Sequence, residues 1–231
     1  MEKSVNIIET ENLIKNEKKE QFDLFFSLLR EYNDKYNLTA ITEEKEVFYK
    51  HFVDSGVGKD LFTPNAKVVE VGSGAGFPSI PLKILRPDLS FILVESVGKK
   101  CDFLQVVVDK LGLTNIQICN KRSEDLGKDE KYREKADFVV ARAVARMNTL
   151  SEYCIPLLKV GGKFIAYKSG DTTEVDEAKN AFKTLGCVLD TVVPYSLPDG
   201  YGERNLVIVK KVKPTPNRYP RGQGKERKNP L

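Results

Sequence analysis

The 231-residue sequence contains no tryptophan, two methionines and one histidine, His51. Its four cysteines are scattered and form no Cys-x-x-Cys pair: Cys101, Cys119, Cys154 and Cys187. Structural zinc sites are usually built from Cys and His at short spacings, so we expect no metal centre. Cysteines without such spacing are typical of reduced thiols in a cytoplasmic protein.

Long apolar runs are absent as well. No stretch approaches the roughly 20 consecutive apolar residues that cross a bilayer, and the first residues do not resemble a signal peptide. We therefore expect a cytoplasmic protein without membrane contact. Because 41% of the residues are hydrophobic, the chain can still bury a sizeable core.

The net charge of +4 hides an uneven distribution. Eight basic residues lie between positions 210 and 231, with Glu226 as the only acidic one, and the rest of the chain is slightly acidic. A basic tail on an acidic body is typical of a protein with a polyanionic partner. We predict that the tail, 214–231, contacts RNA backbone and contributes little to the fold, because it lacks a periodic apolar face. The alternatives are a merely solubilising tail and a tail whose Tyr219 and Pro220 pack onto the body and order it across the cofactor cleft.

Residues 1–60 are predicted to form a helical extension. A second, shorter helix is expected from Glu43 to His51, with Thr42 as its cap. His51, Asp54 and Ser55 form a His-x-x-Asp-Ser pattern that favours a local hydrogen-bonded cap over a catalytic role. The longer helix should bury one apolar face, made of Phe22, Phe25, Phe26, Leu28, Leu29 and Tyr32.

Residues 61–213 alternate between strand and helix patterns. Such alternation predicts an α/β domain, a doubly wound parallel sheet with helices on both faces. The last two strands are close enough to pair as a hairpin, so one of them should be antiparallel. Expected strands are 67–71, 91–95, 115–119, 137–141, 163–168, 188–193 and 205–212; expected helices are 78–85, 97–111, 147–158 and 173–185.

The first of these strands ends in three glycines at alternate positions, Gly72, Gly74 and Gly76. The third glycine of the dinucleotide fingerprint would fall at Phe77, and no Gly-Lys-Ser/Thr follows, so neither a dinucleotide nor a P-loop pattern is present. Glu70 precedes the loop, and a carboxylate there favours a cationic ligand over a pyrophosphate. S-adenosylmethionine, a sulfonium without phosphate, fits this pattern. The glycine loop therefore matches the first motif of class I methyltransferases.

The ends of the following strands carry further candidates. Glu95 lies 19 residues beyond Gly76, where a carboxylate can accept hydrogen bonds from both ribose hydroxyls. Ser123-Glu124 could bind the adenine edge or could cap a short helix. Arg142 could reach the cofactor or an RNA phosphate, or could pair with a carboxylate at the end of the sheet.

The segment after the fourth strand reads Arg-Ala-Val-Ala, without the Asn/Asp-Pro-Pro-aromatic motif common in methylation of exocyclic amines. No cysteine nucleophile stands there either, since Cys154 falls well inside the next helix. N7 of guanine carries a lone pair and no proton, so it fits such a site. Catalysis would then come from positioning and exclusion of water, with no catalytic residue.

Taken together, these segments resemble the bacterial 16S ribosomal RNA guanine-N7 methyltransferase family, the glucose-inhibited division protein B or small-subunit methyltransferase G family. The resemblance runs from about residue 33 to the C-terminus. Departures are small: Glu70 and Glu95 stand where aspartate is frequent, and Ser79 and Ser123 where glycine and alanine are. The matching segments are 37–41, His51 with Asp54-Ser55, 71–78, Glu95-Ser96 with Lys99-Lys100 and Phe103-Leu104, 122–124, 136–145, Thr215-Pro216, 219–221 and 229–231.

The resemblance implies a class I S-adenosylmethionine-dependent fold, Rossmann-like, with a seven-stranded, mostly parallel sheet. It implies methyl transfer to N7 of a guanosine in the 530 loop of 16S rRNA, free or in the 30S subunit. A different RNA, such as tRNA, and a non-catalytic RNA-binding role are the alternatives. Cofactor contacts are expected at Gly72, Ser73, Gly74, Gly76, Phe77, Glu95, Ser96, Val97, Ser123, Glu124 and Arg142. RNA contacts are expected at Arg142, Lys168, Arg204, Arg218, Arg221, Lys225, Arg227 and Lys228.

Overall fold

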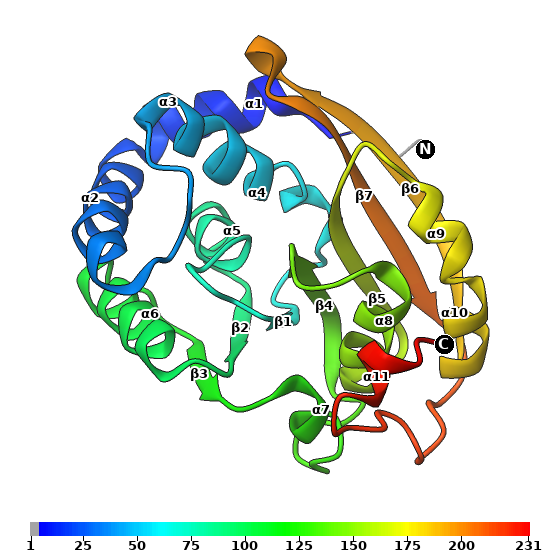
Figure 1. Ribbon diagram of the computed structural model, residues 1–231. Coiled ribbons are helices and arrows are strands. Elements are labelled where there is room, and N and C mark those ends of the chain that lie inside the picture. The colour runs from blue at the N-terminus through cyan, green and yellow to red at the C-terminus, as the bar shows by residue number, and fades with distance from the viewer. Residues whose placement is uncertain (1–4) are drawn as a thin grey trace.

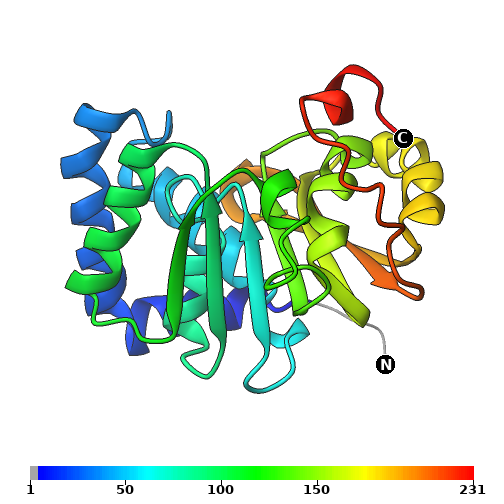
Figure 2. The ribbon, with the colours of Figure 1, turned by 90° about the horizontal axis from the view of Figure 1, so that it is seen from below.

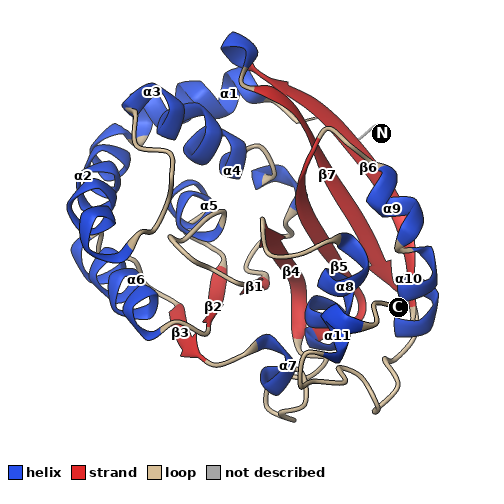
Figure 3. Ribbon diagram, viewed as in Figure 1, coloured by secondary structure: helices blue, strands red, loops and turns tan. Residues whose placement is uncertain are grey.

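A seven-stranded β-sheet runs through the computed structural model, which describes residues 5–231 (Figures 1 and 3). Its strands are β1 (Lys67–Val71), β2 (Ser90–Glu95), β3 (Ile116–Asn120), β4 (Ala136–Arg142), β5 (Leu158–Ser169), β6 (Cys187–Leu197) and β7 (Gly202–Lys211). They lie in the order β3-β2-β1-β4-β5-β7-β6. β7 is antiparallel to β5 and β6, and the other pairings are parallel. This confirms the predicted mostly parallel sheet.

β7 is antiparallel because the link that precedes it is short. Only one short helical turn, Pro198–Gly200, joins β6 to β7, and such a link reverses the chain but cannot cross the sheet. The other strands are connected through helices, which lets them run parallel. Consequently the carboxyl ends of β1, β2, β4 and β5 gather at one edge, where ligands bind in sheets of this type.

Helices cover both faces of the sheet (Figure 1). They are α1 (Ile7–Asn12), α2 (Lys19–Tyr36), α3 (Glu44–Val47), α4 (Asp54–Gly56), α5 (Ser79–Leu85), α6 (Gly98–Lys110), α7 (Ser123–Leu126), α8 (Met147–Cys154), α9 (Thr173–Glu177), α10 (Lys179–Leu185) and α11 (Lys225–Lys228). None of the helices within residues 5–231 combines the length and apolar character of a membrane span.

The sheet separates two hydrophobic cores. One lies under α2, α5 and α6 and includes Phe25, Ile80 and Phe103. The other lies under α8 and α10 and includes Leu150 and Phe182. Alternate side chains of a strand point to opposite faces, so each central strand contributes to both cores and its residues are almost all buried.

The N-terminal helices complete the first core. α2 buries Phe22, Phe25, Leu28 and Leu29, and it packs along α6, where the ring of Tyr32 lies 5.7 Å from that of Phe103. The predicted apolar face of this helix is therefore confirmed. The predicted cap is wrong: Glu43, and not Thr42, caps α3, because its carboxylate accepts hydrogen bonds from the N–H groups that follow it.

The helix expected over 173–185 is interrupted. α9 and α10 are separated at Ala178, whose ψ of −1° ends the regular helical turn. α10 then ends at Gly186, in the left-handed region at φ 86°, as glycine-terminated helices commonly do. The helical stretch was correctly predicted, but its division into two was not.

The C-terminal strap, residues 214–231, corrects a prediction. The basic tail was expected to contribute little to the fold, but it runs from the end of β7 along the side covered by α8 and brings α11 to the edge where the central strands finish (Figure 2). Tyr219 and Pro220 are buried. Arg133 donates to the carbonyls of Tyr219 and Thr215, each at 2.8 Å. The prediction failed because polar contacts and a few rings hold the strap, and these leave no periodic apolar pattern.

Candidate active site

The glycine loop after β1 forms the floor of the candidate site. Gly72, Gly74 and Gly76 all have positive φ, between 54° and 88°. At Gly72 an added Cβ would lie 2.6 Å from Cγ2 of Val144. Glycine therefore lets the segment after β4 approach the loop closely, and it leaves backbone atoms facing the space above.

Glu95 ends β2 beside this loop, with its carboxylate fixed by backbone N–H groups. Oε2 accepts from the N–H of Gly74 at 2.9 Å, and Oε1 accepts from the N–H of Val97 at 2.8 Å. A carboxylate oxygen has two lone pairs, so each oxygen can accept one more hydrogen bond. The side chain is thus oriented in advance for a ligand with two neighbouring hydroxyls.

A cavity of about 300 Å³, the loop cavity, opens above these residues. Five predicted cofactor residues line it: Gly72, Glu95, Ser96, Ser123 and Glu124. Sequence reasoning did not assign to it the remaining lining residues, which are Val71, Val94, Lys121, Arg122, Val144, Tyr153, Gly224 and Arg227. Gly224 and Arg227 belong to the C-terminal strap, and only its docking brings them to the cavity.

A second cavity, the basic cavity of about 390 Å³, lies on the other side of the segment after β4. Arg142 and Ala143 line it, whereas Val144 lines the loop cavity. Ala143 has a φ of 56°, in the left-handed region, at the point where the chain passes between the two. The basic cavity is lined by Ile41, Lys50, His51, Asp54, Arg142, Ala143, Tyr167, Lys168, Ser169, Glu174 and Arg204.

The guanidinium of Arg142 organises one wall of the basic cavity. Nη1 donates to Oδ2 of Asp54 at 2.8 Å and to the carbonyl of Lys50 at 2.9 Å. Oδ1 of Asp54 in turn accepts from the hydroxyl of Tyr195 at 2.9 Å. Arg142 therefore forms a salt bridge, which was one of the predicted alternatives for this residue. The carboxylate belongs to Asp54 on α4, and not to a residue at a strand end.

His51 belongs to the same network. Burial, reinforced by the cation of Arg142, lowers the pKa of His51 to about 3, so the ring is neutral near pH 7. Arg142 has only donors, so Nδ1 of His51 must accept the 2.9 Å hydrogen bond from Nη2. The ring proton therefore sits on Nε2, 2.9 Å from Oγ1 of Thr39.

The predicted local cap at His51 is accordingly wrong. His51 and Asp54 bind a residue about 90 positions further along the chain, and the His51 ring stacks on Phe77 with 4.4 Å between centroids. Arg142 lies over the same Phe77 ring at 5.0 Å. Phe77 is therefore a buried link between the glycine loop and the basic cavity, and it lines neither cavity.

Glu70 also differs from the expectation. It is fully buried, and neither carboxyl oxygen has a hydrogen-bond partner in the structure. Burial raises the pKa of Glu70 to about 8, opposed by the nearby hydroxyls of Ser79 and Ser73. Glu70 lines neither the loop cavity nor the basic cavity, so its carboxyl group does not face the ligand space as the sequence suggested.

The remaining predicted residues fall into three groups. Gly74 and Val97 act through the backbone on Glu95, whereas Ser73 and Gly76 are buried in the loop. Lys168 and Arg204 line the basic cavity; Nζ of Lys168 donates to Oε2 of Glu174 at 3.0 Å and to the carbonyl of Ala145 at 2.9 Å. On the strap, Arg218, Lys225 and Lys228 are exposed, and Arg221 is paired with Glu152.

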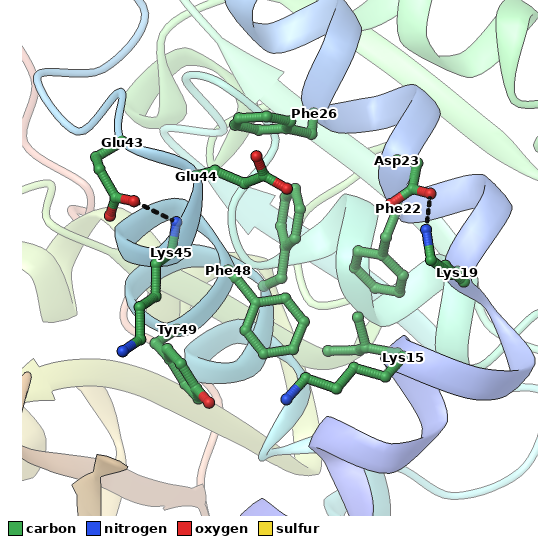
Figure 4. Close-up of a pocket in the computed structure, with 12 residues that line it drawn as sticks. Lys15, Lys19, Phe22, Asp23, Phe26, Glu43, Glu44, Lys45, Phe48 and Tyr49 are labelled. Carbon is green, nitrogen blue, oxygen red and sulfur yellow. Dashed lines mark hydrogen bonds and ion pairs between the residues drawn. The ribbon is translucent and has the colours of Figure 1, made fainter. Parts of the chain in front are cut away.

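A third cavity, of about 650 Å³, lies between α2 and the helical turns of residues 43–52 (Figure 4). Aromatic rings, including Phe22, Phe26 and Phe48, line it together with lysines and carboxylates. It shares no lining residue with the loop cavity or the basic cavity, and no predicted site residue reaches it. Within residues 5–231, no group of three or more His, Cys, Asp or Glu could hold a metal ion.

Strand order, the glycine loop and the carboxylate ending β2 define a class I methyltransferase. Solved structures support this fold. TYW2 of M. jannaschii in complex with AdoMet matches with a TM-score of 0.54 and 15% identity, covering 74% of this chain and 77% of that one. Precorrin-6y C5,15-methyltransferase of Geobacter metallireducens matches with a TM-score of 0.50 and 14% identity, covering 74% and 90%.

The model of the family "rRNA small subunit methyltransferase G" matches residues 18–207. Ribosomal RNA small subunit methyltransferase G of Brevibacillus brevis is 51% identical over 216 residues, covering 92% of this chain and 91% of the relative. The Streptococcus pneumoniae protein of that name is 44% identical over 232 residues, covering 98% and 97%. The chain belongs to this methyltransferase family, and the resemblance inferred from its motifs is confirmed.

Proposed function

We propose that this protein binds S-adenosylmethionine in the loop cavity and methylates N7 of a guanosine in the 530 loop of 16S rRNA, free or in the 30S subunit. The observation that carries the proposal is the pair of cavities divided by residues 142–144. A methyl donor on one side and a base on the other can meet at this segment. A ribosomal substrate would also place the enzyme in the cytoplasm.

The loop cavity fits the donor. Glu95, oriented by two backbone N–H groups, offers acceptors for the ribose hydroxyls, and Ser123 and Glu124 offer a hydroxyl and a carboxyl group for the adenine edge. S-adenosylmethionine supplies, when bound, an electrophilic methyl group on a sulfonium. Gly72 of the glycine loop lines the same cavity, without a Cβ to fill it.

The basic cavity fits a nucleotide of RNA. Lys50, Arg142, Lys168 and Arg204 place four cationic side chains around one opening. The carboxylates of Asp54 and Glu174 line the same cavity and pair with Arg142 and Lys168, so two positive charges are in excess, which favours phosphate. No group there is needed to remove a proton, because N7 of guanine has none. His51, neutral and hydrogen-bonded on both ring nitrogens, holds Arg142 in place and is not free to act as a base.

The test is mass mapping of 16S rRNA from cells that lack the gene. One methyl group on a 530-loop guanosine should disappear, and it should return on complementation with the wild-type gene. Complementation with Lys168→Ala should restore little methylation. Unchanged 16S rRNA together with the disappearance of a methyl group from tRNA would contradict the proposed substrate.

A further inference from the structure

The C-terminal strap is attached to α8 through buried polar contacts. Nη2 of Arg221 lies 2.7 Å from Oε2 of Glu152, which is almost fully buried, and the N–H of Arg221 donates to Oε1 of Glu152 at 2.8 Å. Oγ1 of Thr149, one turn earlier on α8, donates to the carbonyl of Glu226 at 3.0 Å. α8 follows directly on the segment that divides the two cavities, so the strap is fixed relative to both.

This attachment brings α11 to the mouth of the loop cavity, and Gly224 and Arg227 line it together with Glu95 and Glu124. Most basic residues of the strap point to solvent away from the cavity, but Arg227 lies on its wall. Its guanidinium lies against Tyr153, another lining residue, where it opposes the rise that burial causes in the pKa of that tyrosine.

From this geometry we infer that Arg227 is a further cofactor-binding residue and that the strap is one wall of the donor site. The inference rests on the proposed binding of S-adenosylmethionine in the loop cavity. The residues beside Arg227 in the cavity are those expected to hold ribose and adenine, namely Glu95, Ser123 and Glu124. Arg227 therefore contacts the nucleoside half of the ligand, where a planar cation can cover the face of a base.

Calorimetry with the full-length protein tests this, using S-adenosylmethionine, S-adenosylhomocysteine and 5′-methylthioadenosine. All three share the nucleoside, and only the first carries a sulfonium. Arg227→Ala should weaken all three by a similar factor, about tenfold, because the substitution removes an interaction with the shared half. Arg227 is exposed, so the melting temperature of the ligand-free variant should match the wild type. Lys213→Ala, an exposed cation just before the strap, is the control and should change nothing.

Two results would overturn the inference. One is unchanged affinity of Arg227→Ala for all three ligands while the wild type binds them. The other is a weakening confined to S-adenosylmethionine, since that would place Arg227 near the sulfonium and not at the nucleoside. Failure of the wild-type protein to bind any of the three would instead defeat the proposed function itself.

Discussion

The floor of the loop cavity, the glycine loop with Glu95, is set by backbone, whereas the basic cavity is built from side chains. In the first, glycines with positive φ and two N–H groups on Glu95 set the geometry within a few residues of each strand end. In the basic cavity, four elements each contribute a charged residue: Asp54 on α4, Arg142 on β4, Lys168 on β5 and Arg204 on β7. The chain from Asp54 to Arg204 spans about 150 positions. The glycine loop and Glu95 should therefore tolerate distant substitutions that collapse the basic cavity.

Beside each cavity lies a buried ionisable group whose charged form burial disfavours. One is an acid, Glu70, and the other is a base, His51. Glu70, beneath the glycine loop, keeps to higher pH a proton that an exposed glutamate loses near pH 4.5, because burial disfavours its charged form. His51, behind the basic cavity, lacks the proton that an exposed histidine gains in mild acid. The same physical cause, desolvation, thus makes one side of the site sensitive to base and the other to acid.

The largest expected effect is on the basic cavity. Arg142→Met leaves the buried carboxylate of Asp54 with only the more distant guanidinium of Arg204, at 3.7 Å, which should lower the free energy of unfolding by about 3–5 kcal/mol. Urea denaturation measures this directly. Arg146→Met, four residues further on, breaks an exposed ion pair with Glu177 and should cost at most about 1 kcal/mol. Equal destabilisation of the two variants would show that the Arg142 network is not a buried anchor.

The next effect concerns the loop cavity. Glu95→Ala removes acceptors of charge-assisted hydrogen bonds, which contribute about 1.5–3 kcal/mol, so affinity for S-adenosylmethionine should fall about tenfold or more. Calorimetry on the folded variant measures it. Asp125→Ala, an exposed carboxylate on α7, is the matched control and should bind as the wild type does. If Glu95→Ala kept full affinity, the assignment of the loop cavity would be wrong.

The two buried groups predict opposite pH slopes. His51 has a pKa of about 3 when folded and about 6.5 when unfolded, so the unfolded chain binds more protons between these values and stability rises with pH there. Glu70 has a pKa of about 8 when folded against 4.5, so the folded chain holds more protons and stability falls as pH rises from 4.5 to 8.

For each group, the slope of the free energy of unfolding against pH approaches about 1.4 kcal/mol per pH unit. The contribution of a group should vanish when that residue is replaced. Between pH 4.5 and 6.5 the two slopes cancel in the wild type, so urea denaturation across pH 4 to 8 should show a flat region there and a fall above it. His51→Gln should instead lose stability throughout pH 4.5 to 8, and Glu70→Gln should gain stability up to pH 6.5 and lose the fall above it.

The rate of single-turnover methylation should depend on pH in the same way for His51→Gln and for the wild type near pH 6.5. If the wild-type rate changed at that pH and the rate of the variant did not, His51 would be an essential base.

The same contrast explains what sequence could predict. Gly72, Glu95, Ser96, Ser123 and Glu124 were recognised and do lie around one cavity, because each sits at a strand end and parallel strands bring their ends together. The pairing of His51 with Arg142 could not be predicted, since a His-x-x-Asp-Ser pattern is equally consistent with a local cap. Docking of the strap through Tyr219 and Pro220 was the alternative to the favoured free tail. Its anchor could not be predicted, because Glu152 is a buried carboxylate that hydropathy alone places at the surface.

The smallest expected effect concerns the exposed side of the strap. Arg221 is held by Glu152, so among the predicted RNA contacts of the strap the exposed cations Arg218, Lys225 and Lys228 are the ones free to meet phosphate. Removing one cation that binds a phosphate should flatten the dependence of log affinity on log salt by about 0.7 for single-stranded RNA. Lys228→Ala should therefore weaken RNA binding most at low salt.

Filter binding of a 530-loop RNA fragment across a salt series would measure this slope. Lys19→Ala, on α2 at the other side of the molecule, provides the comparison and should leave the slope unchanged (Figure 1). Affinity of Lys228→Ala for S-adenosylmethionine should stay at the wild-type value, because Lys228 does not line the loop cavity. A slope identical to the wild type would mean that this part of the strap stabilises the donor site without touching RNA.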